Sequence, residues 1–319
     1  MQFGFVPISD PERNKMLSFL RSKASQAGTT GLHRSAAGVA VAQVCRRQNA
    51  ERPRLTQCAY HTFSEERDFV DVARGLPNRG WPVVSVLAPG AYNMLLVEAP
   101  DVAEDELRAA VKWRIKDLLD FHIDDAVIEV FQMPLPGRGG PTRMMYAVAA
   151  REQEVRQRVD DATAAGLNLE TIDILELALR NIAVLLDTEG RGVALLYLHH
   201  DGGVLLLVRG GVLYLARHIE TGTEQLRDNP LRNSLVDGLA LEVQRSLDYY
   251  ESNYEQNSIP VAYTWGLEGQ DIAQLNDTLG LDVRALELDA LFEIDTELSA
   301  EVRDLALPAI GGALRSEAA

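Results

Sequence analysis

The fold prediction depends on the stretch YNMLLVEAPDVAEDELRAAVKWRIKDLLDFHIDDAVIEVF, residues Tyr92–Phe131. It opens with a run rich in apolar strand formers, which Pro100 and Asp101 bring to an end. Asp101 and Glu104 have the spacing of a capping box, in which the first side chain accepts an amide of the first helical turn and the second reaches back. The stretch therefore predicts a strand followed by a capped helix.

The predicted helix has two different faces. Apolar residues recur at helical spacing on one of them: Leu107, Val111, Ile115, Leu118 and Leu119. The other carries an i, i+4 row that is either a solvated or a docking stripe: Glu104, Arg108, Lys112 and Lys116. Trp113 fits an interface anchor, because aromatic residues dominate binding hot spots, or else a core position. We predict that this helix presents a partner-binding surface.

Pairs of acidic residues flank this helix. Asp124–Asp125 predicts a turn into a returning strand at 127–131. Glu104–Asp105 and Asp124–Asp125 could be read as catalytic carboxylate pairs, but capping and turn chemistry explain them better. The stretch has no catalytic triad and no metal-ligand pattern.

Composition excludes several classes of function. The 319 residues carry a formal net charge of -16, which argues against nucleic-acid binding and against general attraction to anionic lipid. Cys45 and Cys58 lie in predicted strands and indicate two reduced thiols. No apolar run approaches the roughly 18 residues of a membrane span, and the N-terminus lacks the apolar core of a signal peptide. We expect a cytoplasmic protein, peripheral to a membrane at most.

The order of predicted elements suggests a duplication. Residues 1–28 are expected to be a flexible N-terminal segment. Clustered strands, then helices interleaved with single strands, occur once in 29–189 and again in 190–319. The first half includes an inserted α+β subdomain at about 83–165. This order predicts an α/β fold of two duplicated lobes.

Four phrases carry a resemblance to a known family: LLVEAPDVAEDELRAAVKWRIKDLLDF (Leu95–Phe121), GGVLYLARHIETG (Gly210–Gly222), LALEVQRSLDYYESNY (Leu239–Tyr254) and AIGGALR (Ala309–Arg315). In this organisation and these phrases the chain resembles the PilM family of type IV pilus assembly proteins, and within it the MSHA-pilus branch, MshI. The resemblance implies an actin-like, FtsA/PilM-type fold with ribonuclease H-like lobes. It also implies a place at the inner-membrane platform, where relatives bind the cytoplasmic tail of a PilN-like protein (MshJ in the MSHA system).

The resemblance also locates a nucleotide site. Relatives that bind nucleotide carry two Asp-x-Gly phosphate loops, in which the Asp manages Mg²⁺ or water and the Gly lets amides approach phosphate. In GLHRSAAGVAVA, His33 falls at the Asp position and Ser35, followed by Ala36, at the Gly position. Counting back from Gly211 places Tyr197 and His199 at the corresponding positions of the second loop.

A third part of this nucleotide site is also reduced. The glycine-rich adenosine motif is represented by Gly266-Leu267-Glu268-Gly269, and Ala40 stands where relatives often have Lys. Loss of both metal-side carboxylates removes the charge that holds Mg²⁺-phosphate. The prediction is therefore a degenerate site without ATP hydrolysis, with ATP and Mg²⁺ binding as the open alternative. Ser35 has no neighbouring motif that would make it a nucleophile.

The adjacent histidines of His199-His200-Asp201 could suggest a metal site. Neighbouring residues at a strand end point to opposite faces, so both rarely ligate one ion. A turn is the better interpretation, and we predict no metal site.

We therefore predict a non-enzymatic scaffold of the pilus assembly platform. It would bind the tail of a PilN/MshJ-like membrane protein in a groove between the insertion and the first lobe, beside Arg108, Lys112, Trp113 and Lys116. One alternative is an ATP-dependent switch of the same platform. Another is the cytoplasmic domain of a type II secretion L-type protein. That class needs a membrane span after the actin-like part, and none occurs up to Ala319, so this alternative requires the chain to be a piece of a longer protein.

Overall fold

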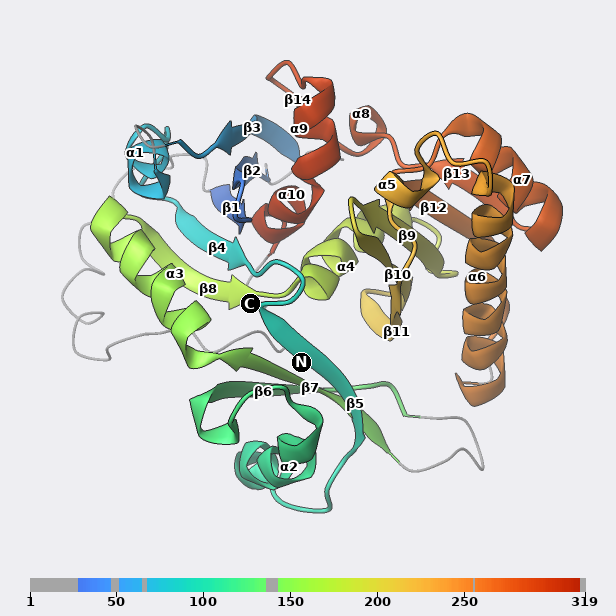
Figure 1. Cartoon of the computed structure of the whole chain (residues 1–319), viewed down its shortest axis with the longest axis horizontal. Coiled ribbons are helices and arrows are strands. Elements are labelled where there is room, and N and C mark those ends of the chain that lie inside the picture. Colours follow the sequence, from blue (N-terminus) through green and yellow to red (C-terminus); the bar gives the residue numbers. More distant parts are fainter. Residues whose placement is uncertain (1–27, 47–51, 65–67, 136–142, 255, 316–319) are drawn as a thin grey trace. The chain divides into compact units, whose positions relative to one another are not determined.

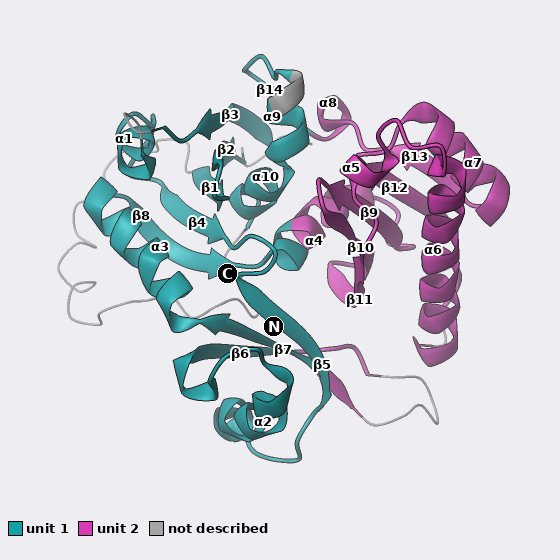
Figure 2. Cartoon of the chain, viewed as in Figure 1, with its two compact units in different colours: residues 1–131, 146–178, 292–319 teal, residues 132–145, 179–291 magenta. Residues whose placement is uncertain are grey.

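The computed structural model describes residues 28–46, 52–64, 68–135, 143–254 and 256–315 (Figure 1). These residues form two compact units (Figure 2). Unit 1 takes the described residues up to Phe131, Tyr146–Ala178 and those from Phe292, and unit 2 takes the remainder. The predicted flexible segment 1–28 lies outside the described residues, apart from Gly28, which opens the first strand.

Unit 1 is built on a six-stranded sheet with the order β14-β3-β2-β1-β4-β8. β1–β2 and β2–β3 are antiparallel, whereas β1–β4, β4–β8 and β14–β3 are parallel. The strands are β1 (Gly28–Arg34), β2 (Gly38–Cys45), β3 (Arg54–Thr62), β4 (Pro82–Val86), β8 (Asn168–Asp173) and β14 (Glu293–Ile294). β1 was not predicted, because GTTGLHR has little apolar periodicity.

Alternation along β1 assigns the two faces of this sheet. Leu32 packs in the cluster that includes Phe69 of α1 (Phe69–Arg74) and Ala165 of α3 (Glu152–Ala165). Gly31 points the opposite way, where an added Cβ would lie 1.8 Å from the carbonyl oxygen of Ala309 in α10 (Leu307–Ala313). Helices α1 and α3 therefore cover one face, and α10 lies directly on the other. Helix α4 (Leu175–Leu186) follows β8, and α9 (Ala300–Leu305) precedes α10.

The inserted subdomain has its own three-stranded sheet with the order β5-β7-β6. Its elements are β5 (Tyr92–Glu98), η2 (Glu104–Glu106), α2 (Leu107–Ile115), η3 (Lys116–Leu118), η4 (Ile123–Asp125), β6 (Ala126–Gln132) and β7 (Met144–Arg151). The predicted insertion, 83–165, is longer than this, because β4 pairs within the six-stranded sheet and α3 packs on α1 and β8.

Unit 2 repeats the arrangement of the first sheet, with the order β11-β10-β9-β12-β13. β9–β10 and β10–β11 are antiparallel, and β9–β12 and β12–β13 are parallel. The elements are β9 (Val193–His199), β10 (Gly202–Arg209), β11 (Val212–Ile219), α5 (Thr223–Leu226), α6 (Arg232–Tyr254), β12 (Val261–Trp265), α7 (Gly269–Leu279), β13 (Asp282–Ala285) and α8 (Leu288–Leu291). The prediction of two duplicated α/β lobes is confirmed.

The lobe boundaries differ from the predicted division at 189/190. Residues from Phe292 group with unit 1, because β14 pairs with β3 and α10 packs on β1, β2 and β4. The main part of unit 2 starts at Leu179, within α4, and the described residues of Gln132–Met145 also group with it. None of the helices in the described part of the chain is long and apolar enough to cross a membrane.

Candidate functional site

The first predicted phosphate loop is the turn between β1 and β2. The Ser35 amide donates to the Gly38 carbonyl at 2.9 Å, which closes a short turn that also contains Ala36. His33, at the predicted Asp position, is the last β1 residue paired with β4, and its Nδ1 lies 3.2 Å from the Val86 carbonyl oxygen. The turn has no acidic side chain, and its glycine is Gly38 instead of residue 35, where the resemblance puts the phosphate-loop glycine.

The second predicted loop is the turn between β9 and β10. Tyr197 is buried in β9 and is the last residue of that strand paired with β12, the position that His33 occupies in the first sheet. His199 ends β9, with its ring centroid 6.1 Å from that of Tyr197. Burial is the main cause that lowers the pKa of His199, so its imidazole favours the neutral form.

The neighbouring turn residues are engaged with one another. His200 lies 2.5 Å from Asp201 through Nδ1 and 3.4 Å from Glu224 through Nε2. No group of three or more His, Cys, Asp or Glu side chains in the described ranges is arranged to hold a metal ion. The carboxylate of this turn thus faces a histidine.

The third element, at Gly266, has a packing role. Gly266 has φ 91°, and a Cβ there would lie 2.7 Å from the Leu198 carbonyl oxygen. Beyond it, Arg232 donates to both oxygens of the buried Asp271 carboxylate, at 2.8 and 2.7 Å, and contacts Glu268 at 2.9 Å. Although burial opposes it, the hydrogen bonds and charge of Arg232 hold the pKa of Asp271 below its usual value. The reduced adenosine motif therefore contains a structural ion pair.

Taken separately, the three elements do not fit a Mg²⁺-nucleotide well. Mg²⁺ takes carboxylate and phosphate oxygens, whereas the first turn supplies an imidazole and the second supplies a buried tyrosine at the corresponding strand position. Ser35, Ala36 and Gly266 lie in turns, His33 and His199 lie at or next to the end of a strand, and Tyr197 lies within β9.

The insertion presents the second candidate site, on α2. Leu107, Val111 and Ile115 are buried, which confirms the apolar face over α2 itself. Leu118 is exposed, because the α-helix ends at Ile115 and a 3₁₀ turn changes the periodicity from 3.6 to 3 residues per turn. The predicted capping box of Asp101 and Glu104 is wrong. The 3₁₀ turn η2 precedes α2 and starts after Ala103, and no side chain caps either η2 or α2.

The predicted contact residues of α2 divide into two groups. Arg108 Nε donates to Glu129 at 2.9 Å and Lys112 Nζ donates to Asp124 at 3.0 Å, so both bases are paired within the insertion. Trp113 is 72% exposed, which contradicts the alternative of a core position. Lys116 Nζ lies 5.8 Å from the centre of the Trp113 ring, within cation–π distance. Trp113 on α2 and Lys116 on the following 3₁₀ turn are thus exposed and lie next to each other.

Sequence reasoning missed a buried polar cluster at the base of the insertion. Tyr92 Oη donates to Glu176 at 2.6 Å and accepts the Leu175 amide at 3.2 Å. Burial raises the pKa of Glu176, which the hydrogen bond from Tyr92 partly offsets. Arg315 Nη1 donates to the fully buried Asp173 carboxylate at 2.6 Å. The one sequence signal for this cluster was Asp173, an acidic residue at the end of strand β8.

Comparisons with known proteins place this architecture. No family model and no curated protein matches the chain. A chain of the PilM–PilN type IV pilus biogenesis complex is 19% identical, covering 91% of this chain and 98% of that chain with a TM-score of 0.61. A protein of actin-like ATPase fold from Bacteroides thetaiotaomicron is 10% identical, covering 84% and 93% with a TM-score of 0.49. The cytoplasmic domain of EpsL, an inner-membrane component of the Vibrio cholerae type II secretion system, is 13% identical, covering 79% and 94% with a TM-score of 0.47.

The likeness to the chain of the PilM–PilN complex, together with the strand order, defines the fold. The chain is an α/β protein of the actin-like type, with duplicated lobes and an insertion after β4 of the first. The fold prediction made from the sequence is confirmed.

Proposed function

We propose that this protein is a cytoplasmic scaffold of a type IV pilus assembly platform, which binds the cytoplasmic tail of a PilN-like inner-membrane protein. The observation that supports it most is the similarity to a chain of the PilM–PilN complex along nearly the whole length of both chains. The four sequence phrases favour the MSHA branch of this class, with an MshJ-like protein as the partner. The scaffold would then be peripheral to the inner membrane.

The inserted subdomain offers the features that such a tail would use. β5 and β6 are the outer strands of its sheet, and an extended peptide can add to a sheet edge through main-chain hydrogen bonds. Trp113, with Lys116 over its ring, is a large exposed aromatic anchor of the kind that dominates interface energetics. Arg108 and Lys112 would contribute after exchanging their present carboxylate partners. We place the groove between the insertion and the first lobe.

A binding titration tests this proposal. A fluorescent peptide with the tail sequence of an MshJ-like protein should bind the full chain, and Trp113→Ala should weaken it by about tenfold or more. Leu231→Ala, at a similarly exposed apolar residue of unit 2, is the matched control and should leave affinity unchanged. Absence of binding at high micromolar peptide to the folded chain would exclude the scaffold role. Equal binding by an unrelated PilN tail would exclude the MSHA assignment alone.

The competing function is an ATP-dependent switch of the same platform. We propose that the chain does not hydrolyse ATP, because His33 and Tyr197 stand where metal-side carboxylates are required. A ligand that binds the folded state raises its melting temperature by mass action. The melting temperature should be the same in millimolar Mg-ATP and in Mg²⁺ alone, and a clear rise would favour the switch.

A further inference from the structure

The inserted subdomain contacts the start of α4 through Tyr92, the first residue of β5. The chain reaches Tyr92 from β4 through a turn in which the Ala91 amide donates to the Ala88 carbonyl at 3.1 Å and Gly90 has φ 86°. It leaves the subdomain where β7 ends at Arg151 and α3 starts at the next residue. The side chain of Tyr92 therefore adds a third connection beside the first of these two main-chain connections.

The phenol of Tyr92 contacts the first turn of α4 at two points. Its Oη donates to Glu176 Oε2 at 2.6 Å and accepts the Leu175 amide at 3.2 Å. The first amides of a helix have no partner within that helix, so a residue of the insertion satisfies one of them in α4. Tyr92 and Glu176 both keep part of their surface exposed, and the pair can therefore exchange protons with solvent.

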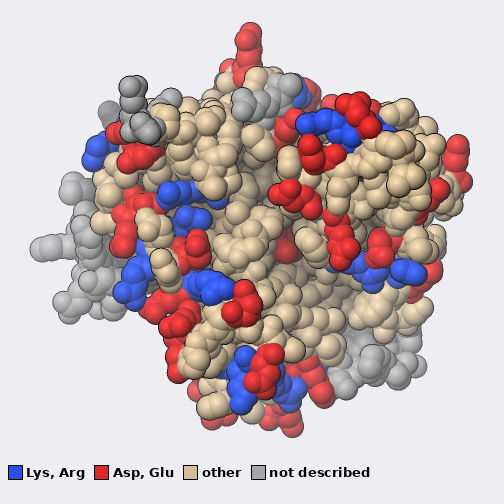
Figure 3. Space-filling view, viewed as in Figure 1, with Lys and Arg blue, Asp and Glu red and all other residues tan. Residues whose placement is uncertain are grey.

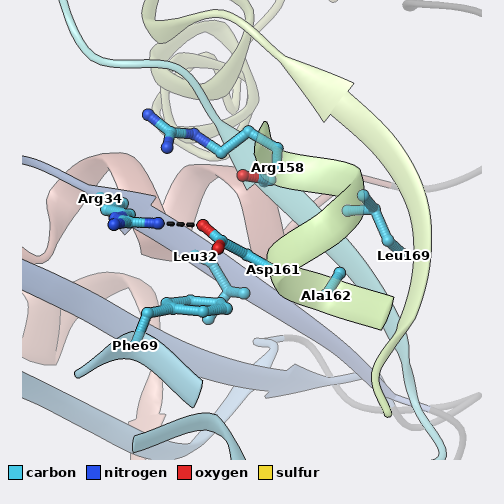
Figure 4. A pocket seen from close by; sticks show the side chains of 8 residues that line it. Leu32, Arg34, Phe69, Arg158, Asp161, Ala162 and Leu169 are labelled. Carbon is cyan, nitrogen blue, oxygen red and sulfur yellow. Dashed lines mark hydrogen bonds and ion pairs between the residues drawn. The ribbon is translucent and has the colours of Figure 1, made fainter. Parts of the chain in front are cut away.

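Glu176 differs from two other carboxylates of unit 1 in the group that faces it. Asp161 pairs with the guanidinium of Arg34 (Figure 4). Asp173 is fully buried and pairs with the guanidinium of Arg315 at 2.6 Å. Glu176 instead accepts a hydrogen bond from a neutral phenol. A phenol stabilises an ionised carboxylate less than a guanidinium does, because it brings no opposite charge.

Four titratable groups meet at this junction: Tyr92 of β5, Asp173 of β8, Glu176 of α4 and Arg315 after α10. Burial is the largest cause that raises the pKa of Glu176; the hydrogen bond from Tyr92 opposes it and the charge of Asp173 adds to it. Burial and then the charge of Glu176 raise the pKa of Tyr92, so the phenol keeps its proton. When Glu176 ionises, the junction holds two carboxylates and one guanidinium.

We propose that Tyr92 and Glu176 form a proton-controlled latch, which fastens the inserted subdomain to the first turn of α4 while Glu176 is protonated. With Glu176 neutral, Asp173 and Arg315 balance each other and the junction has no net charge. Ionisation of Glu176 adds one uncompensated negative charge and favours the open contact. The sign follows from linkage, because a carboxyl whose pKa is raised binds its proton more tightly in the closed form, so a rise in pH favours opening. The latch does not depend on the tail-binding surface of α2.

Hydrogen exchange of the full chain, measured by mass spectrometry at pH 5 and pH 8, tests the latch. The Leu175 amide reports on it directly, because its acceptor is Tyr92 Oη. After correction for intrinsic exchange rates, peptides that cover the first turn of α4 should exchange at least about threefold faster at pH 8. Peptides from β2, which is buried along its whole length, should not change. Equal corrected exchange of α4 at the two pH values, or an equal rise in β2, would overturn the proposal in the wild-type protein.

Three variants separate the latch from ordinary packing. Glu176→Gln keeps a neutral hydrogen-bonding side chain, so the α4 peptides should exchange slowly at both pH values. Tyr92→Phe removes the phenol, so they should exchange fast at both. Glu152→Gln, in the exposed first turn of α3 beside Arg156, is the matched control and should keep the wild-type pH dependence. A pH dependence that persists in Glu176→Gln, or slow exchange in Tyr92→Phe at pH 8, would contradict the latch.

Discussion

The two sheets share strand order and strand directions over five strands, yet differ at two equivalent positions of β1 and β9. His33 and Tyr197 are each the last residue of their strand paired with its parallel neighbour. Two residues earlier stand Gly31 in the first sheet and Leu195, fully buried, in the second. The two sheets therefore have the same topology but different packing at equivalent positions.

The cause of this difference is the C-terminal segment. Helix α10 lies so close to β1 that a side chain at Gly31 would meet its backbone, and Gly312 in the helix faces Val86 of β4 at similarly short range. Figure 3 shows Lys and Arg side chains next to Asp and Glu side chains on the visible face. The first sheet is thus completed by a segment far along the chain.

The largest effect should follow from breaking the attachment of that segment. Arg315→Met leaves the buried Asp173 carboxylate without its ion-pair partner. Loss of one partner of a buried pair costs about 3–5 kcal/mol of unfolding free energy, measured by urea denaturation. Arg191→Met, in a surface pair with Glu189, should stay within about 0.5 kcal/mol. Equal stability of the two variants would mean that the segment does not hold the first sheet.

Gly31→Ala tests the close approach itself. Its Cβ would lie 1.8 Å from the Ala309 carbonyl oxygen, so α10 must shift, and overpacking of this kind costs about 2–3 kcal/mol. Gly80→Ala is the control, because an added Cβ there meets nothing within 4 Å. A Gly31→Ala variant with the melting temperature of Gly80→Ala would show that α10 does not need the glycine.

The sequence predicted the elements whose periodicity is strong. The apolar run Leu175–Leu186 predicts a helix, and α4 has these bounds; three apolar runs in 193–218 predict successive strands, which are β9, β10 and β11. β1 was missed because its alternate residues face a helix backbone, so a glycine stands where a pattern needs an apolar side chain. No local sequence pattern predicts that residues 292–315 pack on the first sheet.

The candidate sites were predictable to the same extent. Ser35 and His199 were placed through the family resemblance; the first lies in the turn between β1 and β2 and the second ends β9. Pairing of Arg108 with Glu129 and of Lys112 with Asp124 depends on which strand and turn lie beside α2. Such tertiary contacts decide which bases of an i, i+4 row remain free for a partner.

A smaller effect is expected on the pH dependence of stability, through the Arg232–Asp271 ion pair. The folded-state pKa of Asp271 is lowered by Arg232, so its contribution to stability is present above its unfolded pKa of about 3.9 and is lost as the pH falls through the folded value. From pH 7 to pH 3 the melting temperature of the wild type should therefore fall further than that of Asp271→Asn. Parallel losses in the two proteins would show that the pair does not hold this carboxylate ionised.

The smallest effect belongs to the insertion, which has no counterpart in the second unit. Burial, more than the opposing charge of Arg108, sets the pKa of Glu129 above its usual value. A raised carboxyl pKa favours the folded state below the unfolded value of about 4.3, and this contribution is lost as the pH rises through the folded value. At pH 7 the free energy of unfolding of Glu129→Gln should therefore lie within about 0.5 kcal/mol of the wild-type value. At pH 4 the variant should be less stable relative to the wild type than it is at pH 7. If the variant instead loses more stability at pH 7 than at pH 4, the Arg108–Glu129 ion pair stabilises the fold. The expected result means that Arg108 can leave Glu129 and bind a partner at little cost in stability.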